Sequence, residues 1–290
     1  MGNVTVHQPR SVTDATRLLS DGAPATLLAG GTDLMVGINA GRIRPERIVH
    51  LGGIDELRTW TTDGSHVVIG AGVTYGQMLD DDVAGLCPGL AQASRTVGSP
   101  QIRNAGTIGG NLATASPAGD TLPVLAALDA TVQLASINGT RTVTLSDFIT
   151  GPKQTALRNG ELIRSVTVPV ASGPQEYLKV GVRNAMVIAL CSVALTVDLE
   201  AGRVAVALGA AGPVPIRATV AEDWVLSHVD LSSNSIADPR TLETFGSMVA
   251  DAARPIDDHR GSAAYRRHAI GVLARRALAR AFPARPAVAA

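Results

Sequence analysis

The chain has 290 residues, of which 46% are hydrophobic and 17% charged, and its acidic and basic side chains balance. This length suits two compact domains or one large one, and the neutral balance argues against nucleic-acid binding, which needs a basic face. No apolar run approaches the roughly 20 residues of a membrane span. The N-terminus lacks the basic and apolar regions of a signal peptide. Cys87 and Cys191 are too few for a disulfide framework or an iron–sulfur site. We therefore expect a cytoplasmic protein with reduced thiols.

The first 51 residues alternate between strand and helix patterns. Gly41 stands where the second helix should end. Strand and helix alternating at this spacing predict a small parallel sheet. The expected strands cover residues 4–7, 26–29 and 47–51, and the expected helices cover residues 12–19 and 33–40.

Residues 56–170 show short β-rich runs that are broken by turn residues. The pair Asn138-Gly139 is typical of a hairpin turn. This pattern predicts an antiparallel sheet with inserted helices, followed by a linker at residues 171–174. The expected strands are residues 67–70, 131–137, 140–144 and 162–168.

Beyond the linker, strands are predicted before helices. The last two strands flank Ala201-Gly202, a hairpin signal. In the final helix Tyr265, Ala269 and Leu273 share one face at helical spacing, and the arginine-rich opposite face is expected to be solvated. The expected strands are residues 176–182, 192–200 and 203–208, the helices are residues 219–227, 239–253 and 262–281, and residues 283–290 are expected to fray. The arginines of the solvated face are Arg266, Arg267, Arg275, Arg276 and Arg280.

Two Gly-Gly loops, at residues 29–34 and 107–112, carry the functional signal. Paired glycines let successive N–H groups point the same way with no Cβ in front of them, which makes a concavity for phosphate oxygens. A helix that starts behind such a loop adds partial positive charge. Two such loops in one small domain predict a ligand with two phosphates, and a dinucleotide cofactor is the simplest candidate.

A third glycine-rich run, residues 67–76, resembles the start of a dinucleotide-binding fingerprint. Its spacing is one residue too long at the third glycine, and no acidic residue lies about 20 positions further on to hold a ribose. We interpret it as a strand end, with Thr74 capping the next helix.

The residues around both Gly-Gly loops resemble the FAD-binding medium subunit of the molybdenum hydroxylases. That family includes xanthine dehydrogenase, carbon monoxide dehydrogenase and related aldehyde and N-heterocycle dehydrogenases. One Gly-Gly loop alone is weak evidence, whereas the matching segments occur in the family's order along nearly the whole chain. These segments are residues 29–34, 101–111, 115–120, 177–183, 207–218 and 260–268.

The resemblance implies an α+β fold in two domains. Residues 1–172 would form an FAD-binding domain of the vanillyl-alcohol oxidase and p-cresol methylhydroxylase type. A small parallel α/β subdomain is expected at about residues 1–55, and an antiparallel-sheet subdomain at residues 56–172. Residues 173–290 would form a smaller C-terminal α+β domain with a three-stranded antiparallel sheet and helices.

By the same resemblance, the two loops hold the pyrophosphate and the adjoining ribose or ribitol. Asp120 matches a position that accepts hydrogen bonds from flavin-side hydroxyls; a second interpretation is that it caps a helix at residues 121–128, and both roles can hold at once. Ile163, Val97 and Lys179 match positions near the isoalloxazine, where a lysine would favour the anionic reduced flavin; alternatively Lys179 is a surface strand lysine. The expected cofactor-binding set is Leu28, Ala29, Gly30, Gly31, Thr32, Asp33, Leu34, Val97, Thr107, Ile108, Gly109, Gly110, Asn111, Ser116, Asp120, Ile163 and Lys179.

The chain departs from the family pattern after Arg183. The family often has an acidic residue just before an Ile-Ala pair, where this chain has Met186 and Val187. The flavin edge is therefore expected to be less negative than in relatives, which bears on the flavin potential and on the electron acceptor.

The chain carries no metal motif and no catalytic residue is expected, so the hydroxylation chemistry is expected on a partner. By resemblance, a large subunit carries the molybdopterin cofactor and a small subunit carries two [2Fe-2S] clusters that pass electrons to the FAD of this chain. The FAD then releases them to NAD or another acceptor. A dimer of heterotrimers is implied, with xanthine or another purine as substrate of the complex.

Other functions stay open at this point. The complex could instead be a carbon monoxide or N-heterocycle dehydrogenase. A stand-alone FAD-dependent oxidase of the same superfamily is a second class, although no catalytic base is evident. A non-catalytic assembly subunit with a vestigial flavin site is a third, and the intact glycine pairs and Asp120 speak against it.

Overall fold

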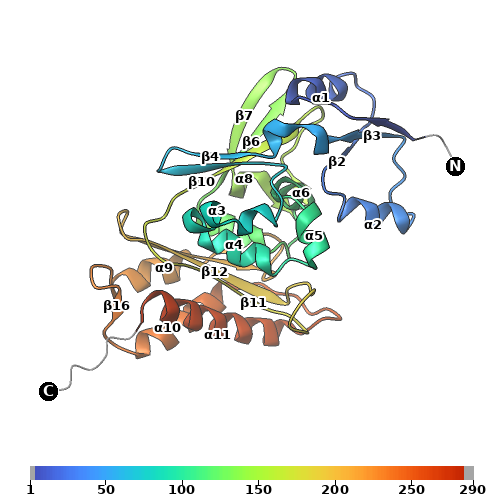
Figure 1. The fold of residues 1–290 in the computed structure, drawn as a ribbon. Coiled ribbons are helices and arrows are strands. Elements are labelled where there is room, and N and C mark those ends of the chain that lie inside the picture. Colours follow the sequence, from blue (N-terminus) through green and yellow to red (C-terminus); the bar gives the residue numbers. More distant parts are fainter. Residues whose placement is uncertain (1–3, 284–290) are drawn as a thin grey trace. The chain divides into compact units, whose positions relative to one another are not determined.

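A computed structural model describes residues 4–283, so residues 1–3 and most of the end that was expected to fray lie outside the described residues (Figure 1). The chain divides into two compact units, each built from three segments. Unit 1 comprises Met1–Asp80, Gly98–Ser116 and Asp129–Pro169, and unit 2 comprises Asp81–Val97, Pro117–Leu128 and Val170–Ala290. Two segments that precede residue 172 thus belong to unit 2, and the domain boundary expected at that residue stays a prediction.

Unit 1 begins with the small parallel sheet that the alternating pattern predicts. Its strands β1 (Thr5–His7), β3 (Arg47–His50) and β2 (Thr26–Leu28) lie in the order β1-β3-β2 and are parallel. Helix α1 (Val12–Leu19) begins at Ser11, whose side chain accepts a hydrogen bond from the N–H of Asp14, and α2 (Leu34–Asn39) follows β2. This subdomain confirms the expected small α/β layer.

The second sheet of unit 1 is antiparallel and has five strands, as the turn-broken pattern predicts. Gly139, with φ at +118°, follows directly on the two residues that turn the β6–β7 hairpin, which is the conformation that glycine tolerates best. The strand order is β4 (Trp60–Thr62), β5 (His66–Gly70), β10 (Leu162–Pro169), β6 (Thr131–Ser136) and β7 (Gly139–Thr144).

Short elements complete unit 1. Thr74 accepts a hydrogen bond from the N–H of Gln77 at 3.2 Å and so caps the short helix η3 (Gln77–Leu79), as predicted. The others are η1 (Leu51–Gly53), η2 (Asp55–Leu57), α5 (Pro100–Ala105), α6 (Ile108–Thr114), α8 (Leu145–Phe148), β8 (Ile149–Gly151) and β9 (Gln154–Thr155).

Unit 2 is built on a four-stranded antiparallel sheet. The three expected strands form β11 (Gln175–Val180), β12 (Cys191–Asp198) and β13 (Arg203–Gly209), and a two-residue strand, β14 (Ile216–Arg217), extends the sheet beyond the predicted three. A small hairpin joins β15 (Val229–Asp230) to β16 (Ser235–Ile236). The helices are α3 (Asp81–Leu86), α4 (Pro88–Arg95), α7 (Thr121–Ala127), α9 (Thr219–Leu226), α10 (Arg240–Ala252) and α11 (Ala263–Ala281).

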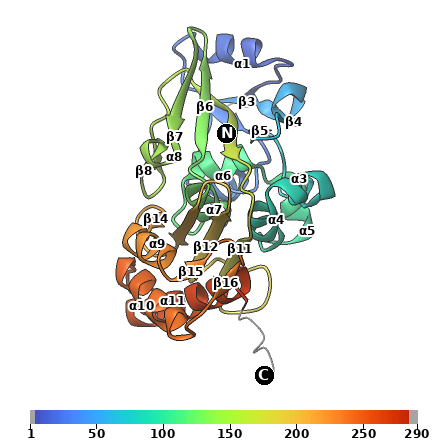
Figure 2. The same cartoon turned by 90° about the vertical axis from the view of Figure 1, so that its left-hand side faces the viewer.

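Both faces of this sheet are covered, because β12 is buried at seven consecutive positions. Alternate residues of the strands, such as Val193, Leu195 and Val206, join the main apolar core with α9, α10 and α11, and α11 runs along β11 and β12 (Figures 1 and 2). Helices α4 and α7 contact the same strands. Strand periodicity places the intervening residues, such as Tyr177 and Lys179 of β11, on the opposite face of the sheet.

Two residues of α11 depart from the predicted helical faces. Arg266 is buried at 3% exposure, whereas Tyr265 is 49% exposed. The guanidinium of Arg266 donates to the carbonyl of Leu190 and to Asp258, both at 2.6 Å. These partners compensate the buried charge, so the expectation that Arg266 lies on the solvated face is wrong.

Helix α6 packs closely against the end of β5. The N–H groups of Ile108 and Gly109 donate to the carbonyls of Val73 and Ala71, at 3.0 and 2.9 Å. A Cβ at position 109 would lie 2.6 Å from both the Cβ and the carbonyl oxygen of Ala71. Glycine is therefore required at this position for steric reasons.

We expect Gly109→Ala to lower the free energy of unfolding by about 1–3 kcal/mol, because the added methyl group overpacks a buried backbone contact. Urea unfolding followed by tryptophan fluorescence measures this loss. The control is Gly85→Ala on α3, where a Cβ meets nothing within 4 Å and where alanine should be neutral or stabilising by up to about 1 kcal/mol. Equal effects of the two substitutions would contradict the steric explanation.

Candidate cofactor site

The first Gly-Gly loop connects β2 to α2 in unit 1. Leu28 ends the strand, Leu34 opens the helix, and Asp33 stands at the helix N-cap position without a capping hydrogen bond from its side chain. Gly31 has φ at +71°, a conformation that other residues rarely adopt. A Cβ on Gly30 would lie 1.7 Å from the carbonyl oxygen of Ala105, so the loop is pressed against the end of α5.

The backbone donors of this loop have no partner within the chain. Across residues 4–283, the N–H groups of Gly30, Gly31 and Thr32 donate to no oxygen of the protein. The three residues are half-buried, and two of them carry no Cβ. A half-buried run of unpaired N–H donors without side chains in front of it fits an anionic oxygen, as the sequence predicts for a phosphate.

The second Gly-Gly loop behaves differently. Thr107 caps α6, and its hydroxyl oxygen accepts the N–H of Gly110 at 3.0 Å. Because the N–H groups of Ile108 and Gly109 bond to the strand end described above, all three donors are engaged within unit 1. The expectation that this loop presents its N–H groups to a phosphate is therefore wrong, since those of Ile108 and Gly109 bond to the segment just after β5 and that of Gly110 bonds to Thr107. The loop can act on a ligand only through other groups, such as the Asn111 side chain.

Unit 1 nevertheless brings the two loops together. Gly30 packs on Ala105, two residues before the second loop, and the Thr114 hydroxyl donates to Asp33 Oδ2 at 3.3 Å. Two segments far apart in the sequence thus meet twice, at Gly30 with the end of α5 and at Asp33 with the end of α6. This juxtaposition is what a ligand with adjacent phosphate and sugar groups needs.

Unit 2 contains a buried polar cluster around Asp120. Its carboxylate accepts from Lys179 Nζ at 2.7 Å, from the Tyr177 hydroxyl at 2.8 Å and from the Thr96 hydroxyl at 3.4 Å. The Asp120 and Lys179 side chains are only 8% and 7% exposed. Asp120 occupies the N-cap position of α7, as the helix-cap interpretation predicts, but its side chain makes no capping hydrogen bond; burial excludes a surface role for Lys179.

Burial and charge act against each other in this cluster. Burial raises the pKa of Asp120, while the charge and hydrogen bond of Lys179, then the hydrogen bonds from Tyr177 and Thr96, oppose that rise. Burial, together with the Asp120 charge, raises the pKa of Tyr177 well above its usual value, so the phenol keeps its proton. The cluster therefore holds a protonated donor, Tyr177, against the carboxylate.

Strand alternation explains how the cluster forms. Gln175, Tyr177 and Lys179 alternate with Leu178 and Val180, which belong to the apolar core on the other face. Gln92 on α4 clamps the strand, because its Oε1 accepts the N–H of Tyr177 at 2.7 Å and its Nε2 donates to the Gln175 carbonyl at 3.1 Å. The clamp sets the register at which Tyr177 and Lys179 reach Asp120.

The remaining expected residues divide between the units. Val97 follows Thr96, whose carbonyl accepts from Lys179 at 3.2 Å, so it adjoins the cluster of unit 2. Ile163 is buried in β10 at a register shift, and Ser116 is half-buried after α6; both belong to unit 1. Tyr177 and Thr96 were missed at the sequence level. Tyr177 could have been found from its i, i+2 spacing to Lys179 on a strand.

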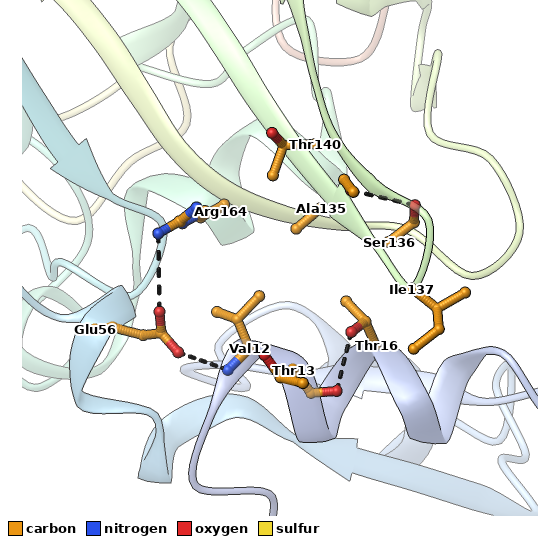
Figure 3. A pocket seen from close by; sticks show the side chains of 10 residues that line it. Val12, Thr13, Thr16, Glu56, Ala135, Ser136, Ile137, Thr140 and Arg164 are labelled. Atoms are coloured by element: carbon orange, nitrogen blue, oxygen red, sulfur yellow. Dashed lines mark hydrogen bonds and ion pairs between the residues drawn. The ribbon is translucent and has the colours of Figure 1, made fainter.

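A separate pocket of about 260 Å³ lies in unit 1 between α1 and the β6–β7 hairpin (Figure 3). Glu56 accepts the N–H of Val12 at 2.7 Å, and its other oxygen lies 4.0 Å from the Arg164 guanidinium, as the dashed lines show. None of the expected cofactor residues lines this pocket. The Glu56 contacts link the start of α1 to the second sheet.

The described residues show neither a metal-binding cluster nor a membrane-spanning helix. Over residues 4–283, no group of three or more His, Cys, Asp or Glu side chains is arranged to hold a metal ion, and no helix is long and apolar enough to cross a membrane. Both cysteines are free and buried, and burial raises the pKa of each thiol to about 12. Neither thiol is therefore reactive at neutral pH.

Comparison with known proteins decides the family. The family profile described as "FAD binding domain in molybdopterin dehydrogenase" matches residues 2–171. The chain belongs to this family. A second profile, "CO dehydrogenase flavoprotein C-terminal domain", matches residues 176–281. The protein is thus a flavoprotein subunit of the molybdenum hydroxylase type, an oxidoreductase component, as the resemblance implies.

Individual relatives cover nearly the whole chain. The glyceraldehyde dehydrogenase medium chain of Sulfolobus acidocaldarius is 35% identical over 92% of this chain and 94% of its own. The xanthine dehydrogenase FAD-binding subunit of Escherichia coli O157:H7 is 30% identical over 96% of both chains. The crystal structure of quinoline 2-oxidoreductase from Pseudomonas putida 86 superposes with a TM-score of 0.87 at 27% identity, over 96% of both chains.

The segment that resembles the family's C-terminal signature has a structural role in unit 2. Asp258 bonds to Arg260 and Arg266, and Arg266 reaches the Leu190 carbonyl. The backbone N–H of Arg260, followed by the Arg266 guanidinium, lowers the pKa of Asp258 to about 2 against the opposing effect of desolvation. This signature therefore fixes the start of α11 against the residue that precedes β12.

We expect Lys179→Met to destabilise the FAD-free chain by about 3–5 kcal/mol, because it leaves the Asp120 carboxylate buried without a cation. Combining it with Asp120→Asn should recover much of that loss, since the double variant buries no charge. Urea unfolding of wild type, both single variants and the double variant measures the coupling. Additive losses would show that the two side chains do not act as a pair.

Asp258 should give the stability a defined acid dependence. Its folded pKa is lowered, so its contribution is full above the pKa of an unfolded aspartate and declines as the pH falls toward about 2. We expect Asp258→Asn to lower the thermal unfolding midpoint at neutral pH, and the gap to wild type to shrink from about pH 5 downward. A gap that stays constant between neutral pH and pH 3 would argue against this ion pair.

Proposed function

We propose that this chain binds FAD non-covalently and passes electrons between a partner's [2Fe-2S] clusters and a soluble acceptor. The observation that carries the proposal is the run of unpaired N–H groups at Gly30, Gly31 and Thr32 in a chain that belongs to this family. When bound, FAD supplies the ability to take up and release one or two electrons. The protein supplies binding, orientation and electrostatics.

Within this proposal, the expected residues take separate tasks. The Gly30–Gly31 loop holds the pyrophosphate through its N–H groups, and Thr32, Thr107 and Asn111 bind nearby hydroxyl or phosphate oxygens. Lys179, on the buried Asp120 cluster, meets the flavin end of the cofactor. The Gly30–Gly31 loop fits a phosphate group of FAD, because it offers unpaired N–H donors with no side chain in front of them.

The partners follow from the same family relationship. The matched relatives are named as a medium chain and an FAD-binding subunit, so each is part of a larger assembly. We propose a large molybdopterin-binding subunit and a small [2Fe-2S] subunit, assembled as a dimer of heterotrimers. A stand-alone oxidase receives no support from these relatives.

The substrate belongs to the complex rather than to this chain. The relatives are named for glyceraldehyde, xanthine and quinoline, so one scaffold accompanies different substrates. We propose a purine such as xanthine, supported by the resemblance of residues 98–104 and 186–189 to purine-type medium subunits, and NAD as acceptor. Purification of the complex through a tag on this chain, with xanthine, glyceraldehyde and carbon monoxide tested as reductants, distinguishes the substrate classes.

We expect the purified chain to bind one FAD, and Gly31→Ala to weaken that binding about tenfold or more. Alanine at φ +71° is strained, and its Cβ would lie 3.2 Å from the Leu28 side chain, which costs about 1–3 kcal/mol where 1.4 kcal/mol is about tenfold in affinity. Titration of FAD fluorescence measures the dissociation constant.

Gly41→Ala is the matched control for this test. Gly41 has φ at +69° just after α2, and a Cβ there meets nothing within 4 Å. It carries the same backbone strain outside the loop, so FAD affinity should stay at the wild-type value. A chain that stays colourless and takes up no FAD would falsify the proposed function.

A further inference from the structure

Helix α7 carries Asp120 at its N-cap position, and a second ion pair of unit 2 holds the other end of this helix. We propose that Arg217, fixed by Glu222, is a positioning residue of the cofactor site: it sets the place of α7 and thereby that of the Asp120 carboxylate. The inference rests on the proposed function, in which the Asp120 cluster meets the flavin end of FAD.

The ion pair is anchored in the sheet of unit 2. Glu222 lies on α9 with its side chain only 8% exposed, and its Oε1 accepts the N–H of Val206 on β13 at 2.9 Å. Its two oxygens accept from Nε and Nη2 of Arg217, both at 2.7 Å. Arg217 belongs to β14, which pairs with β13. Backbone pairing and a bidentate carboxylate therefore fix the guanidinium together.

The third nitrogen of this guanidinium reaches α7. Nη1 of Arg217 donates to the Ala126 carbonyl at 3.0 Å, in the last turn of the helix. A cation is favoured at this end, where carbonyl groups point outward and the helix dipole is negative. Because Glu222 engages Nε and Nη2 and the guanidinium is planar, Nη1 is held in a fixed direction. The contact thus fixes the position of α7 along its axis.

A shift of α7 is transmitted to Asp120 because the helix is short. The helix Thr121–Ala127 spans about 10 Å by the rise of an α-helix. Asp120 Oδ1 accepts a hydrogen bond from Tyr177, and its second lone pair can accept from a hydroxyl of the cofactor. The position of that oxygen depends on both ends of α7, on the contacts with Tyr177 and Lys179 at one end and on Arg217 at the other.

Unit 1 contains a closely matched ion pair. Arg141 on β7 makes bidentate bonds to Glu161, at 2.7 and 2.8 Å, and donates to the Ala156 carbonyl at 2.7 Å. The side chains of Arg141 and Glu161 are 26% and 8% exposed, against 23% and 8% for the pair on β14 and α9. Chemistry and burial are thus alike, but these partners belong to unit 1, whereas α7 belongs to unit 2. The pair in unit 1 is therefore the control.

The test uses the full chain and FAD, with Arg217→Met/Glu222→Gln as the main variant. Removing both charges keeps the stability close to that of wild type, because no buried charge is left unpaired, but it also removes the bond to α7. We expect this variant to bind FAD about threefold to tenfold more weakly in a fluorescence titration. Arg141→Met/Glu161→Gln should keep the wild-type affinity.

Coupling to Asp120 is the second measurement. Asp120→Asn removes the carboxylate through which Arg217 is proposed to act, so in that background Arg217→Met/Glu222→Gln should weaken FAD binding by less than about twofold. Urea unfolding of the FAD-free variants separates a loss of stability from a loss of binding. If the main variant does not fold, Arg217→Lys replaces it, because a lysine can pair with Glu222 but lacks the planar fork that also reaches Ala126.

Three results overturn the inference. The first is a wild-type FAD affinity in Arg217→Met/Glu222→Gln, and the second is an equal loss of affinity in the control pair. The third is a loss of the same size with and without the Asp120 carboxylate, which would show that Arg217 does not act through it. A wild-type chain that binds no FAD would instead refute the proposed function.

Discussion

Burial of the Asp120 carboxylate is the constraint around which unit 2 is organised. Removing a carboxylate from water costs several kcal/mol unless charge and hydrogen bonds replace the lost hydration. Helix α4 supplies Thr96, and β11 supplies Tyr177 and Lys179. These elements must therefore keep one register relative to α7, and the Gln92 clamp on β11 provides it. The ion pair of Asp120 and Lys179 thus holds helix α7 and strand β11 together.

Unit 1 depends on a different constraint: backbone segments approach each other so closely that only glycine, which has no Cβ, fits between them. Gly30 lets one loop lie against the end of α5, and Gly109 lets α6 join the end of β5. The two glycine pairs look alike in sequence but have different roles. The N–H groups of Gly30 and Gly31 are unpaired within the described chain, whereas those of Gly109 and Gly110 make hydrogen bonds inside unit 1. The hydrogen-bond partner of each N–H, not the presence of glycine, separates a ligand loop from a packing loop.

The two units also explain why one scaffold serves relatives named for different substrates. The groups that fit a cofactor are backbone donors and one buried cation, neither of which reads the structure of a hydroxylated substrate. A subunit of this kind presents the same electron carrier whatever reaction supplies the electrons. Under the proposed function, selectivity for substrate belongs to the partner subunits, and the residues of this chain act on the flavin alone.

Much of this protein is determined locally. Hydrophobic periodicity, the hairpin signal at Asn138-Gly139 and the Thr74 cap predict the helices, the parallel layer and the antiparallel sheet correctly, because they depend on interactions between near neighbours in sequence. The order of the motifs along the chain identifies the family by resemblance, as the two profile matches confirm. What only the tertiary structure decided are the partners of Asp120, the burial of Arg266 and Lys179, and the occupied N–H groups of α6. Each depends on which distant segment supplies the opposing donor or acceptor, and a carboxylate or a glycine looks the same in sequence whether that partner is water, a ligand or the chain itself.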